Sequence, residues 1–309
     1  MKKVFLIFLL LHIISSVTVA QEAEPFKTDD GETLFYTKSG HGSKVVLLCG
    51  GPGFSASLMK PWLDSLSHRF EPVLFEQRGT GLSSNVKLDS STINISRACQ
   101  DIDNLREHLG EARLNLCGYS WGCMLALAYA ARYPANVNHL ILLSPGPGGV
   151  DLSTVNAVGD NVKWNTYPAE RDSIAFWGER KNHASDPTRA ARLRMVFSFM
   201  NRFYNHDLGR KALETYLQYA EYNPVMARLM WQDMNKGFDI KALIKKYKGR
   251  CHIIRPRQEV MPGEILLRIK EALPQTEIVY LEKCGHLADL EKPKELFSLI
   301  RSLLSEKRE

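Results

Sequence analysis

The chain has 309 residues, of which 24% are charged, and a formal net charge of +6. The positive excess is mild and spread along the chain, and no basic cluster indicates a nucleic acid partner. The length suits one large α/β domain with an insertion.

The first 20 residues have the pattern of a secretory signal peptide. Lys2 and Lys3 precede an apolar run over residues 4–11, and small and polar residues follow to Ala20. The run is short for a bilayer span, although an uncleaved anchor is the alternative. Cleavage near Ala20 removes two lysines and no acidic residue, so the net charge falls to +4. We therefore expect an exported protein, periplasmic or secreted, with no stable membrane span after cleavage.

Six cysteines in an exported chain raise the question of disulfides. Cys49, Cys117 and Cys251 lie on or beside expected strands, Cys123 lies in an expected helix, and Cys284 precedes a Gly-His pair. These positions predict buried thiols that pack as small apolar groups. The sequence leaves open whether one pair of them forms a disulfide. None shows metal-ligand spacing, and we expect neither a metal nor a cofactor.

Short apolar runs alternate with helical patterns along the chain. A turn at 29–31 opens a hairpin, and the expected strands are 33–36, 45–48, 72–75, 114–117, 140–143, 251–254 and 277–281. The expected helices include 54–70, 92–109, 123–131 and 296–304. This alternation predicts a parallel sheet with helices on both faces.

The alternation stops between two of the strands. Residues 146–248 show helical stretches and no strand pattern, and they are rich in aromatic residues and methionine. We expect a core formed by 21–145 and 249–309, with 146–248 inserted as a helical cap. Ligands of such sheets bind at the carboxyl ends of the strands, so the cap is expected to cover the active site.

Ser120 is the expected nucleophile. It lies in Gly-Tyr-Ser-Trp-Gly, residues 118–122, with an apolar strand pattern before it and a helical pattern after it. A G-x-S-x-G sequence in this strand–turn–helix setting lifts the serine hydroxyl clear of the sheet. The alternative is a serine with a purely structural role in a turn.

A serine hydroxyl needs a base, and His286 is the candidate. It follows the last expected strand, and in this setting the acid and the histidine come after the serine along the chain. Glu259 follows the strand at 251–254 and is the expected acid, which fixes the tautomer of the histidine. Asp151 and Glu264 are rivals for that role.

The oxyanion of the intermediate needs backbone donors. The N–H of Trp121 is one candidate, because this residue follows the nucleophile. The second donor is assigned to Gly51, in the Cys-Gly-Gly-Pro-Gly loop at 49–53 after an expected strand. Glycines allow this loop to turn its backbone inward.

Three of these segments resemble motifs of the proline iminopeptidase family of α/β-hydrolases. They are residues 49–53, the Glu-Gln-Arg-Gly-Thr-Gly-Leu-Ser run at 76–83, and 118–122. The resemblance covers the core, about 24–145 and 249–309, and not the cap. It implies an α/β-hydrolase fold with an inserted cap and a serine aminopeptidase activity.

The departures from the family pattern concern the site. Cys49 replaces a histidine of the loop, and glutamate replaces aspartate at 76 and at 259. Family members hold the free amine of the substrate with glutamates of the cap, which cannot be matched here residue by residue. The candidates are Glu170, Glu179, Glu214 and Glu221.

Two enzymatic functions therefore follow, an aminopeptidase on small peptides and a carboxylesterase on small acyl esters. A hydrolase-like protein that binds ligands without turnover is the alternative from another class. The expected partner is a small-molecule or short-peptide substrate, and the oligomeric state is left open.

Overall fold

A computed structural model of the chain describes residues 22–183, 187–216 and 220–306. The signal peptide expected at residues 1–20 lies outside the described residues, so export stays a prediction from the sequence. In the described part, no helix combines the length and the apolar character that crossing a membrane requires.

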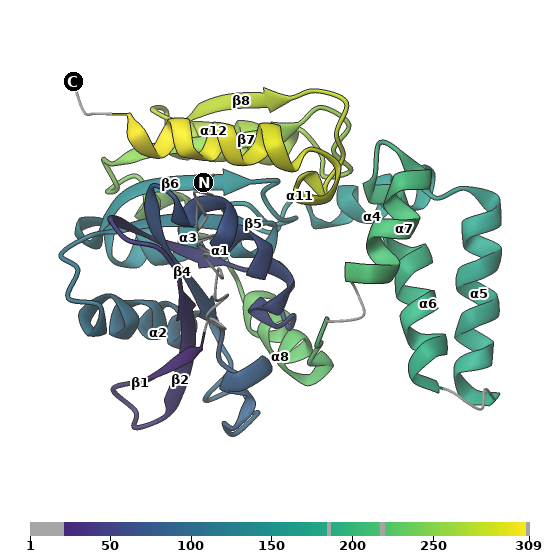
Figure 1. The fold of residues 1–309 in the computed structure, drawn as a ribbon, viewed down its shortest axis with the longest axis horizontal. Helices are drawn as coiled ribbons and strands as arrows, with labels where there is room; N and C mark the ends of the chain where they lie inside the picture. Colours follow the sequence, from purple (N-terminus) through teal and green to yellow (C-terminus); the bar gives the residue numbers. More distant parts are fainter. Residues whose placement is uncertain (1–21, 184–186, 217–219, 307–309) are drawn as a thin grey trace, which may run out of the picture.

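The centre of the fold is an eight-stranded sheet with the order β1-β2-β4-β3-β5-β6-β7-β8 (Figure 1). The strands are β1 (Ala23–Lys27), β2 (Thr33–Lys38), β3 (Ser43–Leu48), β4 (Phe70–Glu76), β5 (Leu114–Tyr119), β6 (Val137–Leu143), β7 (Arg250–Pro256) and β8 (Glu277–Leu281). β2 pairs antiparallel with β1 and β4, and every other neighbouring pair is parallel. The predicted fold class, a mostly parallel sheet flanked by helices, is confirmed.

Helices cover both faces of the sheet, which explains the continuous apolar runs of the strands. Along β3, Val46 and Leu48 join one hydrophobic cluster, whereas Val45 and Leu47 join the other. The helices are α1 (Lys60–Ser67), α2 (Ile95–His108), α3 (Trp121–Arg132), α10 (Glu264–Ala272), α11 (Ala288–Glu291) and α12 (Pro293–Ser305). α2, α3 and α10 contribute to the cluster of Val46, and α1 and α12 to the cluster of Val45.

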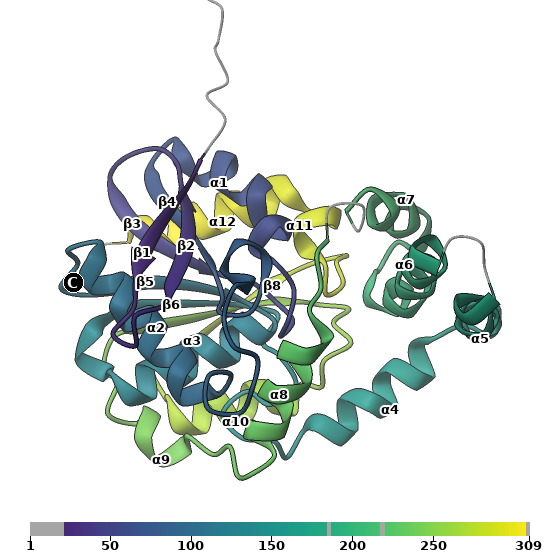
Figure 2. The same ribbon diagram turned by 90° about the horizontal axis from the view of Figure 1, so that it is seen from below.

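The segment between β6 and β7 forms two groups of helices. The first group, which stands to one side of the sheet (Figures 1 and 2), consists of α4 (Val155–Asn165), α5 (Pro168–His183), α6 (Pro187–Phe199), the short 3-10 helix η4 (Met200–Arg202) and α7 (His206–Tyr216). The second group, α8 (Pro224–Met234) and α9 (Lys241–Ile244), packs on the core. Met226, Met230 and Ile244 are buried in the same cluster as α3, so part of the apolar content of this segment belongs to the core.

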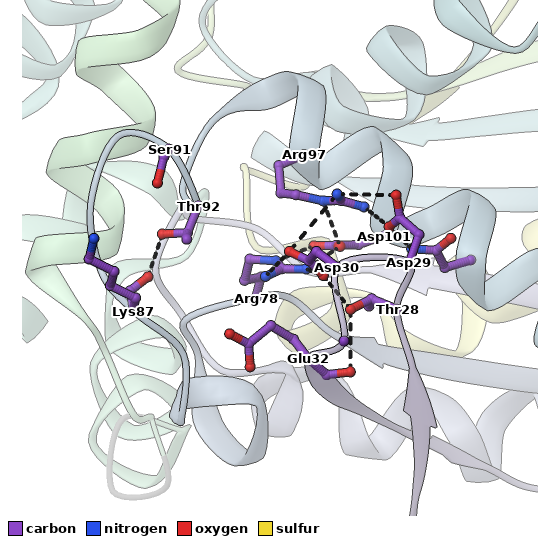
Figure 3. Close-up of polar contacts among 12 residues, drawn as sticks. Thr28, Asp29, Asp30, Glu32, Arg78, Lys87, Ser91, Thr92, Arg97 and Asp101 are labelled. Carbon is purple, nitrogen blue, oxygen red and sulfur yellow. Dashed lines mark hydrogen bonds and ion pairs between the residues drawn. The ribbon is translucent and has the colours of Figure 1, made fainter.

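The N-terminal hairpin is fastened to the core by buried charges (Figure 3). Arg78, just after β4, donates from Nε and Nη2 to both oxygens of Asp101 on α2, at 2.8 and 2.7 Å. Its Nη1 also lies 3.0 Å from a carboxylate oxygen of Asp30 in the hairpin turn. A bidentate contact of this kind fixes the plane of the guanidinium. Through its contacts with Asp101 and Asp30, Arg78 joins the end of β4 to α2 and to the hairpin turn.

All six cysteines are buried free thiols. The expectation of buried apolar thiols is therefore confirmed, and the one disulfide that the sequence left open is absent.

Candidate active site

Ser120 occupies a sharp turn between β5 and α3. Its backbone has φ 54°, a left-handed conformation that is strained for a residue with a side chain. A Cβ atom on Gly118 would lie 2.5 Å from the carbonyl oxygen of Gly122, and one on Gly122 would lie 2.0 Å from that of Leu48. Gly118 is thus required for the turn to form, and Gly122 for the turn to pack against β3.

The structure brings Ser120, His286 and Glu259 together in a hydrogen-bonded chain. Nε2 of His286 lies 3.1 Å from Oγ of Ser120. On the other side of the ring, Nδ1 lies 2.9 Å from each carboxylate oxygen of Glu259. A histidine held in this way has Nε2 free to accept the serine proton.

The carboxylate of Glu259 is wholly buried. Burial by itself raises its pKa, but His286, Arg255 and the backbone N–H of Met261 outweigh this effect and lower the pKa below the usual value. Glu259 is therefore ionised at neutral pH, as a partner of an imidazolium must be.

The two rival acids lie elsewhere. Asp151 forms ion pairs with Lys241 and Arg268, at 2.9 and 3.2 Å. Glu264 is exposed at the start of α10. Neither carboxylate is hydrogen-bonded to His286.

The loop after β3 faces the serine. Gly51 has φ 137° and precedes a cis peptide bond to Pro52, and a Cβ atom on Gly51 would lie 2.9 Å from the amide nitrogen of Gly53. Trp121 is the first residue of α3, where a backbone N–H has no partner within the helix. Gly51 and Ser120 line the same cavity, so the structure places the loop and the serine at one site.

Gln77 joins the two sides of this site, a role that the sequence did not reveal. Its amide nitrogen donates to the carbonyl oxygen of Cys49 at 3.1 Å, and its amide oxygen accepts from the indole N–H of Trp121 at 3.0 Å. Gln77 thereby sets the spacing between the loop and the serine turn. The only signal in the sequence was its position in the motif at 76–83.

A cavity of about 200 Å³ opens above Ser120. Core residues and cap residues line it together: Cys49, Gly50, Gly51, Phe54, Leu58, Tyr119, Ser120, Pro147, Val158, Phe199, Arg202, Leu213, Met261, His286 and Leu287. Most of these side chains are apolar. Among these described residues there is no aspartate or glutamate, and Arg202 is the charged residue that the sequence reasoning missed.

The four glutamates considered for amine binding have different surroundings. Glu170 is buried but accepts from the N–H of Tyr167 and contacts Nδ1 of His206, both at 2.9 Å. Glu179 is exposed. Glu221 is also exposed and lines a second cavity, beside Glu76. The side chain of Glu214 lies outside the described residues, although its backbone belongs to α7, next to Leu213 of the cavity.

Residues 44–293 match the model of the α/β hydrolase fold family. The chain belongs to this family. Within the described residues, no group of three or more histidine, cysteine, aspartate or glutamate side chains is placed to hold a metal ion.

Similar sequences in this family are proline iminopeptidases. The chain is 37% identical over 281 residues to a probable proline iminopeptidase of Leptolyngbya boryana, covering 82% of this chain and 85% of that protein. It is 32% identical over 286 residues to the enzyme of Heyndrickxia coagulans, covering 87% and 93%. A match at 41% identity to the enzyme of Xanthomonas citri spans 122 residues, 38% of this chain and 37% of that protein.

Solved structures share the fold at low sequence identity. A proline iminopeptidase-related protein from Thermus thermophilus has a TM-score of 0.70 at 18% identity, covering 93% of this chain and 98% of that one. An esterase from Exiguobacterium antarcticum has a TM-score of 0.67 at 15% identity, covering 92% and 100%. These likenesses establish the architecture, which hosts more than one hydrolytic chemistry.

Proposed function

We propose that this hydrolase is a serine aminopeptidase of the proline iminopeptidase kind that acts on small peptides. The observation that carries the mechanism is the Ser120–His286–Glu259 chain, of which Ser120 and His286 line a mainly apolar cavity. Proline iminopeptidase relatives that align over most of the chain support the substrate class.

The reaction proceeds in two halves. Oγ of Ser120 attacks the carbonyl carbon of the scissile bond while Nε2 of His286 takes its proton, and the N–H groups of Gly51 and Trp121 hold the resulting oxyanion. When the intermediate collapses, His286 gives that proton to the leaving amine, and an acyl group stays on Ser120. A water molecule, deprotonated by His286, then releases the acyl group and restores the serine.

A carboxylesterase acting on small acyl esters is the second candidate. One observation favours it: the described residues of the cavity include no carboxylate that would bind a free amine. The same serine, histidine and oxyanion donors serve ester cleavage equally well.

Covalent labelling tests the nucleophile. We expect a fluorophosphonate probe to label the protein, because an activated serine attacks phosphorus as it attacks an acyl carbon. Ser120→Ala is expected to abolish labelling while circular dichroism shows an unchanged fold. Labelling that persists in the Ser120→Ala protein contradicts the assignment.

A further inference from the structure

Arg202 brings a positive charge into a cavity that is otherwise mainly apolar. It ends η4 in the cap and lines the cavity together with Ser120 and His286. Among the described residues, no carboxylate oxygen lies within 4 Å of its guanidinium nitrogens, so Arg202 forms no ion pair with them. An aminopeptidase needs no such cation to bind the amine of its substrate, so Arg202 calls for a separate explanation.

Neighbouring groups of the cap hold the guanidinium in place from one side. Nη1 donates to the carbonyl oxygen of Ser198 at 2.6 Å and to Oδ1 of Asn201 at 3.1 Å. The guanidinium carbon lies 4.3 Å from the ring centre of Phe199, which also lines the cavity. Nε and Nη2 have no acceptor among the described residues, and they remain available to a ligand.

The surroundings of Arg202 leave its charge uncompensated. The residue is half-buried. Burial lowers the pKa of Arg202, and the charges of Glu259 and Tyr119 oppose this effect only in part. Both oxygens of Glu259 already contact His286. A partly desolvated cation gains from a nearby anion, and the planar donors of arginine fit a carboxylate. An anionic group on the substrate would balance the charge of Arg202 and accept hydrogen bonds from its free N–H groups.

The backbone of Arg202 fixes this charge next to the catalytic base. Its carbonyl oxygen accepts from the N–H of His286 at 2.7 Å. A Cβ atom on Gly285 would lie 2.2 Å from the same oxygen, so glycine is needed there for the cap to approach. In the proposed reaction His286 protonates the leaving amine as the C–N bond breaks, so the leaving group lies beside this histidine, where the backbone of Arg202 is also fixed.

We propose that Arg202 is a specificity residue that binds the C-terminal carboxylate of a short peptide, on the leaving-group side of the scissile bond. The preferred substrates are then dipeptides, or peptides little longer, with a free C-terminus. This inference rests on the proposed peptidase function. The small cavity, about 200 Å³, agrees with a substrate of this size.

Hydrolysis of matched substrates tests the proposal. Wild-type kcat/KM is measured for a proline-containing dipeptide and for the same dipeptide with a C-terminal amide. We expect the free acid to be preferred by roughly 10- to 100-fold, the range of a hydrogen-bonded charge pair. In Arg202→Gln this preference is expected to disappear, mainly through KM, and Arg202→Lys is expected to recover part of it.

Arg171→Gln is the matched control, since Arg171 is an exposed arginine of the cap on α5 and does not line the cavity. It should keep the wild-type preference. Circular dichroism and a thermal melt establish that each variant is folded.

Two results overturn the proposal. The first is equal turnover of acid and amide by the wild type, and the second is a preference that survives in Arg202→Gln. If the first result is accompanied by faster cleavage of a glutaryl than of a butyryl p-nitrophenyl ester, the carboxylate is bound on the acyl side instead. Fluorophosphonate labelling separates a failure of the role of Arg202 from a failure of the proposed function. If the protein is labelled but does not distinguish acid from amide, only the role of Arg202 is wrong. If the protein is not labelled, the serine mechanism is wrong as well.

Discussion

At the residue scale, local sequence patterns were sufficient to locate the three residues that the structure joins in a hydrogen-bonded chain, Ser120, His286 and Glu259. Ser120 could be located because close contacts impose glycine on both sides of it: a Cβ atom on Gly118 would meet the turn itself at 2.5 Å, and one on Gly122 would meet β3 at 2.0 Å. Glu259 and His286 could be located because each follows a strand that runs parallel to β5, so that all three residues come after carboxyl ends at the same edge of the sheet. Gln77 could not, since its contacts with Cys49 and Trp121 join segments that are distant in sequence. The place of Arg202 in the cavity likewise depends on a distant contact, that of its carbonyl oxygen with the N–H of His286.

Glu259→Gln tests the acid of the proposed triad. The amide is close in size to the carboxylate but cannot stabilise the imidazolium, so we expect kcat to fall by about four orders of magnitude. Asp151→Asn is the control, because Asp151 is engaged with Lys241 and Arg268. Steady-state kinetics of both variants provides the measurement. A large loss of kcat in Asp151→Asn with little loss in Glu259→Gln would reverse the assignment.

At the element scale, the type of each element was predictable but its boundaries were less so. The helix expected over 54–70 is a 3-10 turn, Ala56–Met59, followed by α1 from Lys60. Pro61 has no N–H to donate to the carbonyl oxygen of Ser57, so α-helical hydrogen bonding is interrupted between the 3-10 turn and α1. The helix expected over 92–109 starts at Ile95, because the side chain of Asn94 accepts from the N–H of Arg97 as an N-cap.

A short element, α11, carries a buried carboxyl group that makes stability depend on pH. Oδ2 of Asp289 accepts from the indole N–H of Trp62 at 3.2 Å, whereas Oδ1 is buried without a partner. Burial raises the pKa of Asp289 from 3.8 to about 6, despite the bond from Trp62. The folded protein therefore binds this proton more tightly than the unfolded chain does, so the contribution is favourable at low pH and is lost as pH rises through about 6.

Asp289→Asn removes this charge and should stabilise the fold at neutral and higher pH. We expect the free energy of unfolding to increase by about 1–3 kcal/mol at pH 8, with little change at pH 4. Urea unfolding at the two pH values gives the comparison. Asp160→Asn, at an exposed position of α4, is the control and should change stability little at either pH. An equal gain at both pH values would show that the titration of Asp289 is not the cause.

At the scale of the whole molecule, the core and the cap differ in how far the sequence determines them. The parallel sheet with helices on both faces follows from the alternating strand and helix patterns, whereas the strand order β1-β2-β4-β3-β5-β6-β7-β8 was not predicted. The position of α4–α7 instead depends on a few contacts between distant segments, such as that of Tyr204 N–H with Glu291, at 3.0 Å. No local pattern marks such contacts, so the sequence indicated a cap but not the side chains that it presents to the site.

The cap is accordingly where the choice between peptide and ester substrates is tested. Among the glutamates considered for amine binding, Glu170 is engaged with Tyr167 and His206, and Glu179 and Glu221 are exposed. Glu214, on α7 directly after Leu213, is the remaining candidate. For an aminopeptidase we expect acetylation of the substrate's N-terminus to abolish cleavage of aminoacyl-arylamides, because a buried ammonium requires a carboxylate and the acetylated amine has no charge to offer.

Glu214→Gln should then raise KM for the free-amine substrate by roughly 10- to 100-fold with little change in kcat, since the interaction forms in the ground state as well as in the transition state. Glu179→Gln, also in the cap but at an exposed position, is the control and should leave KM unchanged. Kinetics with paired free and acetylated arylamides, and with p-nitrophenyl esters, supplies both comparisons. Equal turnover of the free and acetylated substrates would mean that no group of the cap binds the amine, and the esterase function would then account better for an apolar cavity above Ser120.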